Sequence, residues 1–131
     1  MKKISVLVME DSPIIKKRIK DILNDTKVVR QLFFAEGLPE GVAIIDRYGP
    51  EVVFLDINLP DGNGLKNLYD IRQKYPAIKV IIITNQEYEK YKQVSMHLGA
   101  YCYLDKSYDF DKIATVIQEI SRAHASAISK P

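Results

Sequence analysis

Residues 52–56, Val52-Val53-Phe54-Leu55-Asp56, are the stretch that decides the fold, because four apolar residues run directly into one carboxylate. An apolar run without polar alternation is typical of a strand covered on both faces, as in a parallel sheet. Three further runs have the same character, at residues 4–9, 80–83 and 100–104. These runs predict four buried strands, one of which spans residues 52–55.

A fifth, weaker run lies at residues 28–35, where Arg30 and Gln31 interrupt the apolar residues. This mixture suits a strand nearer the edge of a sheet, where one side stays in contact with water. Segments with apolar residues at helical spacing separate and follow the five runs. These segments predict helices at residues 12–24, 39–48, 63–74, 87–98 and 109–123.

Strands that alternate with helices predict a parallel sheet with helices on both faces, because crossovers between parallel strands are right-handed. We therefore predict one α/β domain over residues 1–123. The Ala- and Ser-rich residues 124–131 are predicted to be a flexible tail or the start of a linker. The length of 131 residues and the hydrophobic fraction of 47% agree with a single globular domain.

Charge and apolar run lengths exclude several classes of function. The formal net charge is +2, from 19 Lys and Arg against 17 Asp and Glu, which is too small to indicate binding to nucleic acid. Every apolar run is far shorter than the roughly 18 residues of a membrane-spanning helix, and no secretion signal is recognised. The single cysteine, Cys102, excludes an intrachain disulfide. We predict a cytoplasmic protein without a membrane partner.

Polar residues follow the four buried runs at the point where each run ends. Glu10 and Asp11 follow the first, Asp56 and Thr84 follow the next two, and Lys106 comes shortly after the last. In an open parallel sheet, ligands bind beyond the carboxyl ends of the strands. We therefore expect three carboxylates, one hydroxyl and one ammonium to meet at one edge of the sheet.

This set of groups is suited to phosphoryl transfer. Neighbouring carboxylates repel one another unless a cation enters, and Mg²⁺ prefers oxygen ligands together with phosphate oxygens and water. Asp56, alone at the end of a central-looking strand, is the best candidate for a nucleophile toward phosphorus. Lys106 and Mg²⁺ would neutralise charge while Thr84 donates a hydrogen bond.

The chain resembles the receiver domain of bacterial two-component response regulators, of the chemotaxis-Y type, from Ile4 to about Ser121. The resemblance implies a flavodoxin-like, doubly wound sheet of five parallel strands in order 2-1-3-4-5 with five helices. It implies that the domain is not an enzyme, apart from catalysing its own Mg²⁺-dependent phosphorylation and dephosphorylation. It rests on the order and spacing of Glu10-Asp11-Ser12, of Phe54-Leu55-Asp56-Ile57-Asn58-Leu59-Pro60 with Gly62 and Gly64, of Ile82-Ile83-Thr84, and of Gly99-Ala100 followed by Tyr103-Leu104-Asp105-Lys106.

The resemblance assigns Asp56 as the phosphoacceptor and as a Mg²⁺ ligand. Asp11 is the second direct ligand that it implies, Glu10 acts through water, and the backbone carbonyl of Asn58 completes the protein's share of the metal shell. Because an added phosphoryl group carries about two negative charges, the surrounding groups are expected to rearrange when it binds.

Three further residues have roles that the resemblance implies. Thr84 is the switch hydroxyl that turns toward the phosphoryl group, and Tyr103 is the switch aromatic whose ring follows Thr84. Lys106 is expected to pair with the phosphoryl group. The surface that responds is formed by the fourth helix, the fifth strand and the fifth helix, and it contains Tyr88, Tyr91, Tyr101 and Tyr103.

The resemblance also implies partners. The donor is a phosphohistidine on a sensor histidine kinase or a histidine phosphotransferase, which docks on the first helix near Lys16, Lys17 and Arg18. The output partner is an effector protein or domain that the sequence does not name. Family members also dimerise through the responding surface on phosphorylation, so a homodimer is among the partners that the resemblance allows.

Four positions depart from the family pattern or vary within it. Ser107 follows Lys106 where the family has a proline after a cis peptide bond, which predicts either a cis bond before serine or a locally different loop. Asn85 follows Thr84 where the family has a small residue, which predicts narrower access to Asp56. Asn58 and Gln86 occupy the two positions that tune the lifetime of the phosphoryl group.

Other functions fit the residues less well. A receiver-like interaction module that does not cycle phosphate would not need the complete set of acids, Thr84 and Lys106. An aspartate-nucleophile phosphatase needs a D-x-D pattern after the first strand, where this chain has Glu10-Asp11-Ser12-Pro13. A flavin carrier needs a phosphate-binding loop with Ser or Thr and Gly at the same place.

Overall fold

Five strands and five helices alternate along residues 3–59, 63–85 and 89–129, the part of the chain that this computed structural model describes. Each strand is followed by a helix, as predicted. The elements are β1 (Ile4–Met9), α1 (Pro13–Asp25), β2 (Val29–Ala35), α2 (Leu38–Tyr48), β3 (Val52–Asp56), α3 (Gly64–Lys74), β4 (Lys79–Thr84), α4 (Glu89–His97), β5 (Cys102–Asp105) and α5 (Phe110–Ser129).

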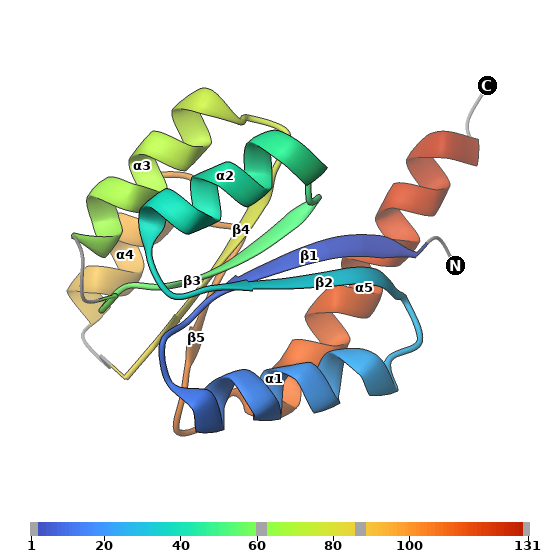
Figure 1. The fold of residues 1–131 in the computed structure, drawn as a ribbon, viewed down its shortest axis with the longest axis horizontal. Helices are drawn as coiled ribbons and strands as arrows, with labels where there is room; N and C mark the ends of the chain where they lie inside the picture. Colours follow the sequence, from blue (N-terminus) through green and yellow to red (C-terminus); the bar gives the residue numbers. More distant parts are fainter. Residues whose placement is uncertain (1–2, 60–62, 86–88, 130–131) are drawn as a thin grey trace.

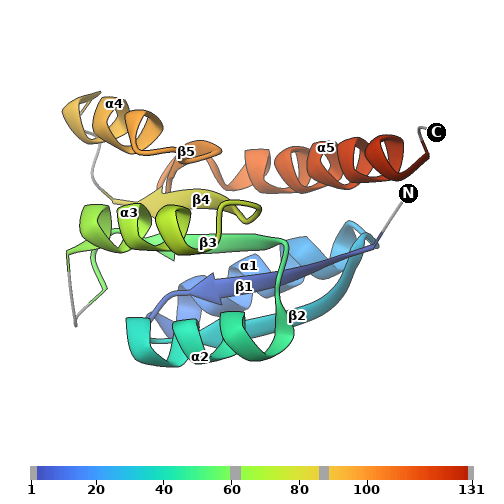
Figure 2. The same ribbon diagram turned by 90° about the horizontal axis from the view of Figure 1, so that it is seen from above.

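The strands form one parallel sheet in the order β2-β1-β3-β4-β5. This arrangement confirms the predicted flavodoxin-like fold and the predicted strand order. The mixed-polarity run lies in β2 at one edge of the sheet, as its composition indicated, and Figure 2 shows this edge strand beside β1. The uninterrupted apolar run of β3 lies in the middle.

Helices cover both faces of the sheet, with α2, α3 and α4 on one face and α1 and α5 on the other (Figure 1). Alternate residues of β3 serve the two layers. Val52 and Phe54 belong to the apolar cluster that includes α1 and α5, whereas Val53 and Leu55 belong to the cluster that includes α2 and α3. This alternation explains why the run is apolar at every position, since both faces are buried.

Local sequence signals start or end three of the helices at or next to the predicted residues. The Ser12 hydroxyl accepts a hydrogen bond from the Ile15 N–H at 3.3 Å, which satisfies one free donor of the first turn of α1. Asn63 caps α3 in the same way through Leu65 and Lys66. At the end of α2, Gly49 has a φ of 57°, the left-handed conformation that glycine adopts without steric cost.

Several boundaries differ from the predicted ones. The strands β3, β4 and β5 include the polar residues Asp56, Thr84 and Asp105, because backbone pairing continues beyond the last apolar side chain. Helix α5 continues to Ser129, so the predicted helix end at residue 123 is wrong. Whether residues 124–131 lead into a linker stays a prediction. The predictions for Gln86 and Tyr88 and the motif residues Pro60 and Gly62 lie outside the described residues.

Within the described part of the chain, no helix combines the length and the apolar character that crossing a bilayer requires.

Gly64 lies where the start of α3 approaches the end of β3 too closely for a side chain. A Cβ atom added at Gly64 would lie 2.3 Å from the Ile57 carbonyl oxygen and 2.4 Å from the Ile57 Cα. At Gly41 in α2, the three atoms nearest to an added Cβ all belong to the Met9 side chain, whose Cε would be 2.7 Å away. Backbone atoms cannot yield as the end of a methionine can.

We predict that Gly64→Ala lowers the free energy of unfolding by about 1–3 kcal/mol or more, the usual cost of overpacking, because Ile57 must shift. Gly41→Ala is the matched control, also at a buried helical glycine, and should change it by less than about 1 kcal/mol, since alanine also gains helix propensity. Urea unfolding of both variants measures the difference. Equal destabilisation by the two variants would contradict the assigned close approach.

Candidate functional site

Polar residues at the carboxyl ends of the central strands lie level with one another because the strands are in register. Met9 pairs with Leu55, so the residues that follow them, Glu10 and Asp56, are neighbours. Side chains of a strand alternate between the two faces of the sheet. Glu10 and Asp56 therefore continue the positions that face α1 and α5, and Lys106, two residues after Leu104, does the same.

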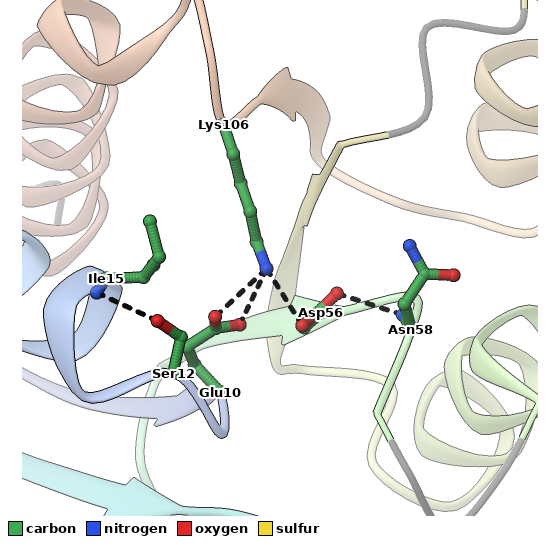
Figure 3. A network of polar contacts seen from close by, with 6 residues as sticks. All are labelled: Glu10, Ser12, Ile15, Asp56, Asn58 and Lys106. Atoms are coloured by element: carbon green, nitrogen blue, oxygen red, sulfur yellow. Dashed lines mark hydrogen bonds and ion pairs between the residues drawn. The ribbon is translucent and has the colours of Figure 1, made fainter.

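The Lys106 ammonium joins two buried carboxylates. Its Nζ lies 2.9 Å from Oε1 and 2.9 Å from Oε2 of Glu10, and 2.9 Å from Oδ2 of Asp56 (Figure 3). The Lys106 side chain is 9% exposed, Glu10 is fully buried and Asp56 is 2% exposed. Charges so withdrawn from water require partners with short, direct contacts, which this cluster provides.

Asp11 adds a third carboxylate to the same place. One oxygen each from Glu10, Asp11 and Asp56 lie within 4.8 Å of one another, and Asp11 is the member of the set that reaches solvent. Among the described residues, three carboxylates at this spacing and one ammonium leave an excess of negative charge. An all-oxygen donor set with access to water fits Mg²⁺ or a similar hard divalent cation. The acidic residues can therefore hold a metal ion.

The protonation of Glu10 reflects this burial. Desolvation, followed by the hydrogen bond with Asp56, raises the pKa of Glu10 from 4.5 to about 7, and the Lys106 ammonium only partly opposes the shift. Desolvation lowers the pKa of Lys106, but its hydrogen bonds with Asp56 and Glu10 outweigh that effect, so the pKa is raised. The cluster thus favours a charged lysine and resists full ionisation of Glu10.

Thr84 and Tyr103 lie at the same edge but continue the positions of the opposite face of the sheet. Thr84 is fully buried at the end of β4, and Tyr103 packs against the apolar cluster beneath α2 and α3. Desolvation raises the pKa of the Tyr103 phenol, while a side-chain hydrogen bond with Thr84 lowers it. The two predicted switch residues are therefore in contact with each other.

The loops around Asp56 and Lys106 show the local backbone that the sequence left open, including the peptide bond between Lys106 and Ser107. The Asn58 N–H donates to Oδ1 of Asp56 at 2.9 Å, and the metal-ligand role of the Asn58 carbonyl stays a prediction. No peptide bond among the described residues is cis, so the bond between Lys106 and Ser107 is trans and the loop differs locally from the family pattern. Asn85 is exposed just past β4, and its predicted effect on access is untested.

The basic residues of α1 make contacts within the chain. Lys16 lies 3.7 Å from Glu36, Lys17 lies 3.0 Å from Asp21, and the Arg18 guanidinium carbon lies 4.0 Å from the centre of the Phe110 ring. These contacts are at the surface and contribute little to stability. The predicted role of this stretch in donor docking is untested.

The contact between Glu10 and Lys106 was not predicted from the sequence. The resemblance gave Lys106 the phosphoryl group as its partner, and no local signal links residues 96 positions apart. The usable signal is that each residue continues the side-chain alternation of its apolar run. Once the register between the strands is known, this alternation places both residues on the same face of the sheet.

Comparison with known proteins agrees with this geometry. The family model described as response regulator receiver domain matches residues 6–118. Among curated proteins, the transcriptional regulatory protein DegU of Brevibacillus brevis is 27% identical over 123 residues, which cover 94% of this chain and 52% of DegU. The chain spans about half the length of such curated relatives.

Solved structures of similar proteins have the same arrangement of elements. The response regulator domain of Thermotoga maritima CheB matches with a TM-score of 0.77 and 26% identity, covering 93% of this chain and 98% of that one. The Mn²⁺-bound form of the response regulator Rcp1 matches with a TM-score of 0.74 and 25% identity, covering 89% of this chain and 91% of that one.

We predict that Glu10 makes the metal-free protein less stable as the pH rises from 4.5 to about 7. In that window the folded protein holds a proton that the unfolded chain has lost, so each step in pH favours unfolding. A shift of this size corresponds to on the order of 3 kcal/mol. In Glu10→Gln, urea unfolding at pH 5 and pH 8 with a chelator present should lack this loss.

The matched control is Glu40→Gln, which replaces an exposed glutamate in the first turn of α2. It should keep the wild-type dependence on pH. If Glu10→Gln and wild type lose stability in parallel between pH 5 and pH 8, the raised pKa of Glu10 is wrong.

Proposed function

Since the chain belongs to the response regulator receiver domain family of two-component systems, we propose that it is a phosphoacceptor whose acceptor is Asp56. The observation that carries the proposal is the Asp56 carboxylate at the end of β3, buried beside the Lys106 ammonium at 2.9 Å and within a cluster of three acids. The proposed donor is a phosphohistidine of a sensor histidine kinase or histidine phosphotransferase.

The proposed reaction is a displacement at phosphorus. An oxygen of Asp56 forms a bond to phosphorus while the P–N bond to the donor histidine breaks, and the imidazole leaves with the electron pair. Lys106 is close enough to Asp56 to neutralise charge on the transferred oxygens, which is the main requirement of phosphoryl transfer. Water later attacks phosphorus, the bond between phosphorus and the Asp56 oxygen breaks, and inorganic phosphate leaves while the Asp56 carboxylate is restored.

Glu10, Asp11 and Asp56 are the side chains that we propose to hold Mg²⁺, with the Asn58 carbonyl as a further ligand. When bound there, Mg²⁺ would supply positive charge to the acids and to the phosphoryl oxygens. Receiver domains are generally not enzymes in their own right, and we propose no reaction of this chain beyond its own phosphorylation and dephosphorylation.

The proposed switch uses the contact between Thr84 and Tyr103. A phosphoryl group on Asp56 would offer the Thr84 hydroxyl a strongly charged acceptor, which competes with Tyr103 for the same hydroxyl. The Tyr103 ring would then be free to change position. Tyr91 and Tyr101 are exposed on α4 and beside β5, so a change at Tyr103 would reach a surface that already carries large side chains.

We propose that this surface, formed by α4, β5 and α5, binds the output partner or a second phosphorylated copy of the chain. The donor is proposed to dock at the other side of the site, on α1. Ile14 supports this placement because it is 80% exposed in the first turn of α1, close in sequence to Glu10 and Asp11. This exposed side chain beside the acidic site is available for contact with the proposed donor.

We predict that incubation with Mg²⁺ and acetyl phosphate adds the mass of one phosphoryl group to the intact protein. Asp56→Asn should add none, because the amide lacks the nucleophilic oxygen anion, and a chelator should abolish the gain in wild type. Asp70→Asn, which changes an exposed aspartate of α3, is the matched control and should gain the same mass as wild type.

A phosphorylated Asp56→Asn variant would place the acceptor elsewhere in the chain. If wild type gains no mass with acetyl phosphate or with a phosphorylated histidine phosphotransferase domain, the chain is not a phosphoacceptor. A role as a binding module that does not cycle phosphate would then be the better explanation.

We predict opposite effects of two substitutions on Mg²⁺ affinity. Asp11→Asn removes a ligand charge and should weaken binding by about tenfold or more. Lys106→Met removes a positive charge 2.9 Å from the Glu10 and Asp56 carboxylates and should strengthen binding. Isothermal titration calorimetry measures both affinities, and Asp21→Asn, an exposed aspartate of α1, is the control. Equal affinities in all four proteins would place the cation outside this cluster.

A further inference from the structure

The turn between β5 and α5 holds Lys106 between two aspartates that bind each other's backbone. The Asp105 N–H donates to Oδ2 of Asp109 at 2.8 Å, and the Asp109 N–H donates to the Asp105 carbonyl at 2.9 Å. Asp105 is the last residue of β5, and Asp109 directly precedes α5. These reciprocal bonds close the turn at both ends.

A third bond lies inside the turn, directly beside Lys106. The Ser107 N–H donates to Oδ1 of Asp105 at 2.6 Å. Aspartate side chains often bind the backbone two residues ahead in this manner, which stabilises a turn. Ser107 is exposed and makes this contact through its backbone, so the bond requires an N–H that a proline would lack.

These bonds complete the restraint on the Lys106 backbone. On its amino-terminal side, the Lys106 N–H donates to the Thr84 carbonyl at 2.8 Å, which extends the pairing of β5 with β4. On its carboxyl-terminal side, the Asp105 carboxylate holds Ser107. Beyond the turn, Phe110 is buried in the core at the start of α5, beneath the Arg18 guanidinium. The turn is therefore anchored to rigid elements at both ends.

The position of the backbone matters because the lysine side chain is long and flexible. Lysine carries its ammonium on four carbons, and its three rotatable donors do not by themselves select one geometry. Here Nζ makes contacts of 2.9 Å with Glu10 and Asp56 from different strands. The backbone bonds on either side of Lys106 fix where this flexible side chain starts, and so limit where its ammonium can lie relative to β1 and β3.

We propose that Asp105 is a positioning residue for the reaction at Asp56: its carboxylate, through the Ser107 N–H, holds the backbone that places the Lys106 ammonium. Asp109 supports it by accepting the Asp105 N–H. Asp105 itself is not among the residues whose carboxylates contact the Lys106 ammonium, so its effect passes through Lys106. The inference rests on the proposed phosphoacceptor function and adds a residue that this function did not include.

The test compares the initial rate of phosphorylation by acetyl phosphate among variants of the whole chain. Asp105→Ala removes the acceptor of the Ser107 N–H and should slow phosphorylation by about tenfold or more, as a small misplacement of a reacting group does. Asp105→Asn keeps an oxygen at that place and should restore most of the rate. Asp111→Asn, in the first turn of α5, is the matched control with the wild-type rate.

A second variant separates the N–H of Ser107 from its hydroxyl. Ser107→Ala removes the hydroxyl but keeps the N–H, so it should be phosphorylated at the wild-type rate. A purely structural role of the turn would reduce stability without slowing phosphorylation, so urea unfolding of each variant is measured beside its rate. A wild-type rate in Asp105→Ala would overturn the inference.

A double-mutant cycle with Lys106→Met decides whether Asp105 acts through Lys106. If it does, Asp105→Ala slows the wild type but causes no further loss in the Lys106→Met background, since the group that it positions is absent. Rate losses that multiply in the double variant would mean that Asp105 affects the reaction by another route, and the inference would be overturned.

The affinity for Mg²⁺ separates a failure of this inference from a failure of the proposed function. If wild type accepts no phosphoryl group, the proposed function is wrong, and calorimetry with Mg²⁺ still tests the placement of Lys106. Asp105→Ala should then strengthen Mg²⁺ binding in the same direction as Lys106→Met, because the displaced ammonium no longer opposes the cation. An unchanged affinity in Asp105→Ala would overturn the inference.

Discussion

The buried ammonium of Lys106 needs carboxylates within direct contact, and this need ties together the parts of the fold that form the site. Its two acid partners come from different strands, Glu10 following β1 and Asp56 ending β3. A buried charge that lost its partners would cost several kcal/mol. The register between β1 and β3 and the turn after β5 must therefore be maintained together, and the two apolar layers supply the rigidity that maintains them.

The negative charge of the same cluster is incompletely neutralised, which links the stability of the fold to the chemistry of the site. Three acids and one ammonium lie together, which leaves an excess of negative charge, and burial followed by the hydrogen bond with Asp56 raises the pKa of Glu10. A divalent cation relieves that excess, and so does a proton. A cluster of buried acids that is costly to keep without a metal ion favours binding of the cation and of the phosphoryl group that the proposed function requires.

Alternation along the strands separates the residues that we propose to react from the residues that we propose to act as a switch. Glu10, Asp56 and Lys106 continue the positions facing α1 and α5, whereas Thr84 and Tyr103 belong to the opposite face. Thr84 lies at the boundary between these sets, with its backbone carbonyl bound by the Lys106 N–H and its hydroxyl in contact with Tyr103. In the proposed switch, a change at Asp56 would therefore reach the surface near α4 and β5 through Thr84.

Most of the fold could be predicted from local patterns, because continuous apolar runs and helical spacing record which faces are buried. Val52 to Leu55 and its companion runs gave the strands, and Ser12 and Gly49 gave helix ends. The inclusion of Asp56, Thr84 and Asp105 in strands was not predictable in this way, since backbone pairing does not depend on side-chain polarity. The end of α5 was misjudged because Ala and Ser in residues 124–129 resemble a tail yet are compatible with a helix.

The sequence by itself determined the class of the fold, the family, and which residues gather at the carboxyl edge of the sheet, because each of these follows from the order and spacing of motifs. Only the tertiary structure decided which of those residues touch. The pairing of Lys106 with Glu10, the contact of Tyr103 with Thr84, and the support of Ser107 by Asp105 depend on register, side-chain alternation and the path of one turn. The order and spacing of motifs along the chain do not specify which side chains meet across separate strands or within a turn.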